Sequence, residues 1–248
     1  LVGLFRQADA KTLAEGIKLL DEDRETLALK IELLDLYVQR QRAGKAVSLP
    51  DDLRRLGKAL GQHGEHAQSA TALLEAYQLL QKTPDTPARK TAIEATWSEC
   101  LLAMLNGSDP AFAQMLSSPP AKPLFDVGYG DLVGRLDALR KQKQYLPIVS
   151  LCDAGLVRLA KQLSPTRTRQ LQSLRQWATK KQADLDAQQI KSLLPSLLSA
   201  DLDTRDEAIK AIKPLGQRAI APLFDQLNAK LKETPPAPRD EGTLFDLL

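Results

Sequence analysis

The two histidines of the chain, His63 and His66, lie on either side of Glu65 and are the first candidates for metal chemistry. Imidazole nitrogens and carboxylate oxygens are common zinc ligands, but a zinc site needs further ligands held in tetrahedral geometry. The chain has no third histidine, and neither Cys100 nor Cys152 lies near this stretch in the sequence. The HExxH spacing that places two imidazoles on one helical face is also absent. We therefore interpret the segment as a solvated loop and predict no metal site.

Three other patterns fall short of a catalytic or cofactor site. Residues 201–206 begin like a calcium loop, but Asp206 stands where that loop requires glycine and Ile212 where it requires glutamate. Gly128 and Gly130 lack the Lys-Ser/Thr pair of a phosphate-binding loop. No Gly-x-Ser-x-Gly motif occurs, and neither cysteine has the sequence context of a nucleophile. We predict no catalytic residue and no cofactor, and therefore a protein that is not an enzyme.

Residues 135–191 form a basic segment inside a nearly neutral chain. They contain twelve Lys or Arg, four Asp and no Glu, a local net charge of +8, whereas the whole chain carries +3. Basic side chains beside an aromatic ring can hold phosphates while the ring stacks on a base. The candidates near Trp177 are Arg169, Arg175, Lys180 and Lys181. They do not form one stripe on a helical wheel, so we expect a solvated helix face and keep nucleic-acid or polyanion binding as the alternative function.

Residues 234–248 are a Pro-rich polar spacer followed by an apolar patch, a composition typical of a flexible tail. The patch, Leu244-Phe245-Asp246-Leu247-Leu248, resembles the Leu-x-x-Leu-Leu peptides that dock into nuclear-receptor grooves. It also resembles clathrin-box peptides and, more distantly, bacterial sliding-clamp peptides. Leu244, Phe245, Leu247 and Leu248 are therefore a candidate docking motif. The alternative is a tail that leads into, or folds back onto, neighbouring structure.

The composition favours helices. Aromatic residues make up only 4% of the chain, while Leu, Ala, Gln and Lys are abundant, which disfavours a β-sandwich or barrel. No apolar run approaches the roughly 18 residues needed to cross a bilayer. Cys100 and Cys152 lie within apolar helical patterns, which fits inert thiols in a reducing compartment. We expect an all-α, cytoplasmic protein.

Residues 188–231 contain three helical segments separated by short turns. The expected inward faces are Leu193, Leu194, Leu197 and Leu198; then Ala208, Ile209, Ile212 and Leu215; then Ile220, Leu223, Phe224 and Leu227. Gly216 follows the second segment, where a left-handed cap is easiest. The order of apolar helix, acidic turn, Arg205 and a Leu-Gly ending resembles a HEAT repeat. A HEAT unit cannot bury its apolar faces alone, so the resemblance implies stacked neighbours.

Small residues recur at intervals between residues 53 and 84. Leu56-Gly57 stands where a tetratricopeptide repeat has its Leu-Gly pair, which lets a second helix approach closely. Ser69 or Ala70, and then Ala76, occupy positions that this family keeps small, so the stretch resembles a tetratricopeptide repeat. After a Gln-Tyr turn at residues 144–145, a helix with Gly155 at its waist belongs to a second stretch with the same resemblance.

Three prolines and two glycines fall within residues 117–130, which we expect to form no regular helix. We interpret residues 118–130 as a crossing segment between an N-terminal helical half, residues 1–117, and a C-terminal half, residues 131–233. The expected helix N-caps are Asp9, Ser48, Thr86, Ser164 and the acids at 201–203. The helix capped by Ser164 should end before the HEAT-like stretch.

Taken together, the resemblances imply an α-solenoid of about a dozen helices in stacked antiparallel pairs. Such folds mostly bind peptides or proteins, so the predicted function is a non-enzymatic protein–protein interaction scaffold with a protein or peptide partner. Because the chain begins with Leu1 and not Met, we expect that a signal peptide or a whole upstream domain has been removed. We predict that the scaffold is a module of a larger protein.

Overall fold

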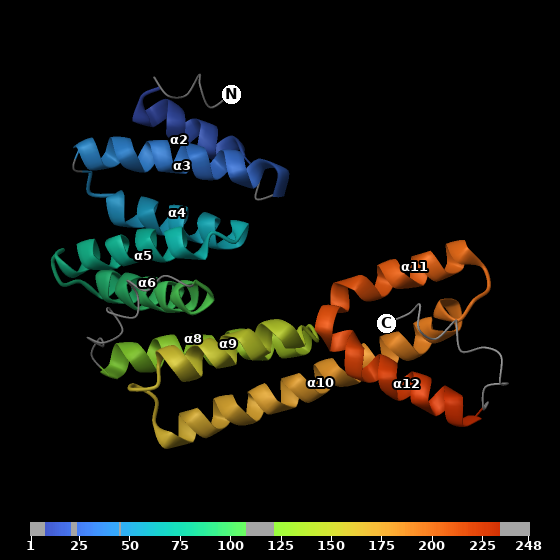
Figure 1. Cartoon of the computed structure of the whole chain (residues 1–248). Coiled ribbons are helices and arrows are strands. Elements are labelled where there is room, and N and C mark those ends of the chain that lie inside the picture. The colour runs from blue at the N-terminus through green and yellow to red at the C-terminus, as the bar shows by residue number, and fades with distance from the viewer. Residues whose placement is uncertain (1–7, 21–23, 45, 108–121, 234–248) are drawn as a thin grey trace. The chain divides into compact units, whose positions relative to one another are not determined.

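The computed structural model describes residues 8–20, 24–44, 46–107 and 122–233 (Figure 1). Within these residues 87% of the chain is helical and no strand occurs, which confirms the predicted all-α class. The same residues form fewer helices than the expected dozen. None of the described helices combines the length and apolar character that a membrane crossing requires.

The chain divides into two compact units, Leu1–Ser173 and Leu174–Leu248, which we call unit 1 and unit 2. The division falls inside a single long helix, α10 (Pro165–Leu197), and not at residues 118–130. One reason for the smaller number of helices is that α10 runs without a break into the HEAT-like stretch, where the sequence predicts a new helix.

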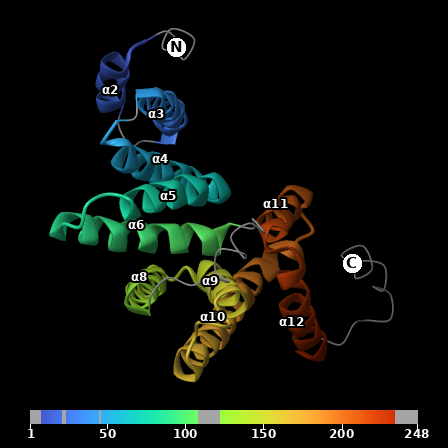
Figure 2. The same cartoon turned by 90° about the vertical axis from the view of Figure 1, so that its left-hand side faces the viewer.

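Unit 1 is a succession of helices in which neighbours along the chain pack against one another. They are α2 (Ala10–Leu19), α3 (Arg24–Gly44), α4 (Leu49–His63), α5 (His66–Gln81), α6 (Pro87–Asn106), α8 (Lys122–Lys141) and α9 (Tyr145–Arg158), followed by the start of α10. Each of the helices from α2 to α6 contacts the next, α6 contacts α8, and α9 lies against both α6 and α8. Figures 1 and 2 both show α2 to α6 as a stack.

Gly57 allows α5 to approach α4 closely. A Cβ atom at this position would lie 2.6 Å from Cγ of Leu73 and 3.2 Å from the backbone oxygen of Ser69. Carbon atoms in normal contact are about 3.5–4.0 Å apart, so only glycine fits here without movement. The Ser69 hydroxyl donates a hydrogen bond of 2.6 Å to the carbonyl oxygen of Gly57 across the same contact. Ser69, Ala70 and Ala76 are buried, as the small-residue pattern predicts.

Helix α8 corrects the prediction that residues 117–130 hold no regular helix, since it begins at Lys122 and includes both glycines. Pro123 lies in its first turn, where a missing N–H leaves no hydrogen bond unmade. A Cβ atom on Gly128 would lie 2.9 Å from Cδ2 of Leu101 and 3.1 Å from Nε1 of Trp97. Gly128 is therefore the point where α8 packs against the buried Trp97 of α6.

Most of the predicted N-caps are formed. The side chains of Asp9, Thr86, Ser164 and Asp201 accept hydrogen bonds from the backbone N–H of Thr12 (2.8 Å), Arg89 (3.1 Å), Arg167 (3.3 Å) and Thr204 (3.1 Å). Ser48 is the exception, because α4 begins beside it without a side-chain cap hydrogen bond. Pro50 lies in the first turn of α4, where its missing N–H reduces the number of donors that need a cap.

Unit 2 contains the larger part of α10, α11 (Leu202–Ile212), a 3₁₀ segment η1 (Lys213–Ala219) and α12 (Ile220–Glu233). Its buried cluster is small: Ile190, Leu215 and Ala219, with Ile212 and Leu223 packed against them. Arg218 of η1 reaches the buried Asp186 of α10, with its NH1 atom 3.0 Å from Oδ2. Gly216 has a positive φ of +56°, which favours glycine, but its ψ of −135° lies outside the left-handed helical region. The predicted left-handed cap is therefore not formed: α11 ends earlier, at Ile212, and Gly216 lies inside η1.

Part of the predicted core of unit 2 is exposed instead. Leu198, Ile209, Ile220 and Phe224 keep 45%, 45%, 56% and 46% of their surface accessible, although their spacing places them on apolar faces. Spacing identifies an apolar face but does not show whether another element covers it. The described part of unit 2 therefore leaves these four apolar side chains partly uncovered.

The packing at Gly57 predicts opposite effects for two glycine substitutions. Gly57→Ala should lower the free energy of unfolding by about 1–3 kcal/mol, because the added methyl group overlaps α5. Gly134→Ala is the matched control: at this exposed position of α8, no atom lies within 4 Å of the place that the added methyl group would take. The control should raise stability by about 0.5–1 kcal/mol, because alanine favours a helix over glycine. Urea denaturation measures both, and equal shifts would contradict the close approach of α4 and α5.

Candidate functional site

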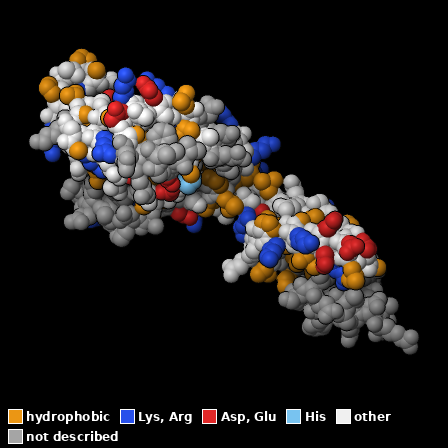
Figure 3. Space-filling view, turned by 90° about the horizontal axis from the view of Figure 1, so that it is seen from above, with side chains coloured by type: hydrophobic (Ala, Val, Ile, Leu, Met, Phe, Trp, Pro, Cys, Tyr) orange, Lys and Arg blue, Asp and Glu red, His pale blue; other side chains and the backbone are white. Residues whose placement is uncertain are grey.

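The four basic residues named as polyanion candidates lie on α10, and all of them are exposed. Arg169 belongs to unit 1, whereas Arg175, Lys180 and Lys181 belong to unit 2. With 100° between successive helical residues, Arg175 and Lys181 point about 120° apart. The Nζ atom of Lys181 also lies 4.0 Å from Oδ2 of Asp184. These directions therefore do not form one stripe along α10. Basic and acidic side chains are also mixed on the face of the molecule that Figure 3 shows.

The two histidines, the candidates for metal chemistry, have different neighbours. His63 places Nδ1 2.7 Å from Oε1 of Glu65, whereas His66 lines a shallow hollow of about 300 Å³ with Asn106. Among the described residues no group of three or more His, Cys, Asp or Glu side chains could hold a metal ion. The tail residues Leu244, Phe245, Leu247 and Leu248 lie outside the residues that the structure describes.

Both cysteines are buried and neither forms a disulfide, so their positions are unsuited to a nucleophile. Burial raises the pKa of the Cys100 thiol to about 12, because the thiolate would lose its hydration in the core of unit 1. Its Sγ atom faces the carbonyl oxygen of Ala70 at 3.8 Å. At neutral pH this thiol is protonated, so it cannot attack a substrate as a thiolate.

A groove formed by α3, α4 and α5 in unit 1, with a volume of about 410 Å³, is suited to holding another molecule. Its floor consists of Ile31, Leu56, Leu60 and Ala72, which retain 9%, 5%, 6% and 7% exposure. Residues deeper in the same core, such as Leu53 and Val38, have none. The floor is thus the part of the core that the groove leaves open. The polar lining consists of Glu32, Asp35, Arg42, Gln68, Thr71 and Glu75.

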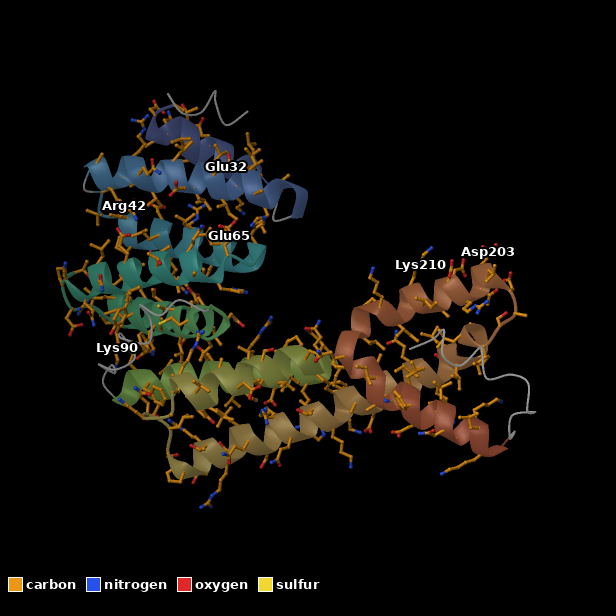
Figure 4. All side chains as sticks on the ribbon, viewed as in Figure 1. Glu32, Arg42, Glu65, Lys90, Asp203 and Lys210 are labelled. Atoms are coloured by element: carbon orange, nitrogen blue, oxygen red, sulfur yellow. The ribbon has the colours of Figure 1, made fainter. Side chains whose placement is uncertain are left out.

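An ion pair joins the two walls of the groove. Arg42 of α3 donates from Nε to Oε1 of Glu75 at 3.0 Å and from NH2 to Oε2 at 2.5 Å, so the pair is bidentate. The hydrogen bonds to Glu75 raise the pKa of Arg42, and the charges of Glu75 and Asp35 raise it further. Because both partners are well exposed, the pair adds only about 0–1 kcal/mol to stability. It links α3 and α5, which both pack on α4. Figure 4 labels Glu32 and Arg42, the two charged groove residues that lie furthest apart along α3.

Sequence reasoning missed this groove. Asp35 and Arg42 are seven residues apart and therefore lie on one face of α3, beside the apolar Ile31, which is a weak signal in the sequence. The partner Glu75 is 33 residues further along the chain, so the pairing depends on how α5 packs. The spacing of residues within a single helix therefore could not predict the Arg42–Glu75 pair.

Comparison of the chain with protein-family models, curated protein sequences and solved structures finds no match. What the fold and the site define is a class: an all-α chain whose first unit carries an apolar groove with charged walls. The HEAT-like and tetratricopeptide-like resemblances remain predictions.

The burial of the thiols predicts their reactivity. Iodoacetamide at about pH 8 should leave Cys100 and Cys152 unmodified in the folded chain and label both in urea, because both thiols are buried away from the reagent. The raised pKa of Cys100 also keeps its thiol protonated. A Ser150→Cys variant, exposed on α9, should be labelled rapidly in the folded chain and serves as the control. Mass spectrometry counts the modified residues. Labelling of Cys100 at the rate of the control would contradict its place in the core.

Proposed function

We propose that the chain is a protein–protein interaction module that holds a segment of another protein in the groove of α3, α4 and α5. The observation that carries this proposal is the groove itself, because a volume of about 410 Å³ over an apolar floor lies within the range of ligand-binding clefts. A few polar side chains around an apolar floor orient a bound segment and give it specificity. A protein segment that carries both apolar and polar side chains can place the apolar ones on the floor and the polar ones against the walls.

The proposal includes the repeat architecture of the two units. We interpret unit 1 as a short α-solenoid of stacked helix pairs, supported by the packing of each helix on the next and by the close approach at Gly57. In unit 2, the exposed Ile209, Ile220 and Phe224 are supporting observations for a HEAT-like pair, since such pairs leave an apolar side for a stacked neighbour. Solenoids commonly bind proteins along their helices, which is an argument from resemblance.

Polyanion binding through residues 135–191 has no comparable observation in its favour. Its four candidate side chains are divided between the two units and do not form a stripe along α10. It stays a hypothesis from charge alone.

Filling the groove tests the proposed function. Thr71 is exposed, lines the groove and donates its hydroxyl only to the Ala67 carbonyl at 3.0 Å, so Thr71→Trp occupies the groove without removing a tertiary hydrogen bond. Peptides selected from a random displayed library on the full chain should bind Thr71→Trp about tenfold or more weakly than the parent, as expected when a central contact is blocked. Fluorescence anisotropy with the selected peptides measures the change.

Thr179→Trp is the matched control. Thr179 is also exposed, lies in α10 and donates to the carbonyl four residues earlier, Arg175, at 3.0 Å. The selected peptides should bind this variant as tightly as they bind the parent. Equal binding to Thr71→Trp and the parent would contradict the proposal, and so would a selection that enriches no peptide.

A further inference from the structure

The groove is lined by residues that carry more negative than positive charges. Its lining contains three carboxylates, Glu32, Asp35 and Glu75, but only one cation, Arg42. Both charged ends of the Arg42–Glu75 pair are engaged with each other. Two carboxylates on the α3 side remain, giving the lining a net charge of −2.

These two carboxylates stand side by side. Glu32 and Asp35 are three residues apart on α3 and therefore share one face of the helix. Asp35 accepts one hydrogen bond through Oδ2, at 2.7 Å, from the amide of Gln39, which carries no charge. Glu32 is exposed and has no ion pair with any residue in the described part of the chain. Ile31 and Glu32 both line the groove, so apolar surface and negative charge meet at its α3 edge.

The juxtaposition restricts what can occupy the groove. An apolar or acidic segment lying on the floor would take Glu32 and Asp35 out of water without a partner, or would repel them. A Lys or Arg next to the apolar side chains would instead form charge-assisted hydrogen bonds with them. The whole chain carries +3, so attraction for a basic segment is a local property of this groove and not of the net charge.

Resting on the proposed function, we propose that the occupant is a basic segment of a partner protein, with apolar side chains on the floor and Lys or Arg facing Glu32 and Asp35. Arg42 and Glu75 close one side of the site, because their mutual pairing leaves neither free to bind a second charge. The selection is electrostatic and acts at the α3 wall.

Two synthetic peptides of equal length test this inference on the full chain. One peptide has Leu on one helical face, at every third or fourth position, and Lys on the opposite face. The other peptide has Glu in place of every Lys. Fluorescence anisotropy at neutral pH should show the Leu/Lys peptide binding the parent at least about tenfold more tightly than the Leu/Glu peptide. In the double variant Glu32→Gln/Asp35→Asn, the Leu/Lys peptide should lose roughly tenfold in affinity and most of its salt dependence. Glu207→Gln, an exposed glutamate of α11, is the control for the loss of one negative charge and should change nothing.

The outcomes separate this inference from the proposed function. If both peptides bind equally, and both are blocked by Thr71→Trp, the groove binds segments but does not select for positive charge, and the inference is wrong. If Thr71→Trp leaves the binding of the Leu/Lys peptide unchanged, the groove is not the site and both proposals fall. An unchanged affinity of the double variant for the Leu/Lys peptide also overturns the inference.

Discussion

The close packing of α5 on α4 is the constraint on which the rest of unit 1 depends. It requires a position without a side chain at Gly57, because Leu73 and the backbone of Ser69 occupy the space opposite. The Ser69 hydroxyl also donates a hydrogen bond to the Gly57 carbonyl across this contact. Once α5 lies this close to α4, Thr71, Ala72 and Glu75 reach the side of α4 that also meets α3. The next helix depends on the same arrangement, since α6 packs on α5 and pairs Glu99 with Arg54 of α4 at 2.7 Å.

The groove follows from this packing because α3 and α5 both lie against α4 while their polar side chains stay at the edge. The Arg42–Glu75 pair spans the two helices at the edge of the groove, and the apolar floor lies beneath. Such a pair contributes little to stability because water screens it, but its planar, bidentate geometry gives the wall a defined shape. Stability thus rests on the contact of Gly57 with Ser69 and Leu73, whereas the proposed binding rests on the charged residues at the edge of the groove.

The sequence was sufficient for the helical class and for four of the five N-caps, because each of these depends on neighbours within one or two turns. The sequence also indicated the contact at Gly57, which joins residues of two helices, through the spacing of its small residues. It failed at α8, where Gly128 looks like a helix breaker and is a packing site for Trp97, a residue of another helix. It overestimated burial at Ile209 and Phe224, because apolar spacing does not show whether a neighbour is present. The groove was missed for the same reason, since its walls come from helices distant in the sequence.

The central claim is that binding takes place at α3, α4 and α5, and hydrogen exchange measured by mass spectrometry tests it most directly. The full chain is compared with and without a saturating amount of the Leu/Lys peptide. The account predicts slower amide exchange in peptides from α3 and α5, with the exchange of α11 and α12 unchanged, because a ligand suppresses the local opening of the elements that hold it. Slower exchange confined to α10 or to unit 2 would contradict the account.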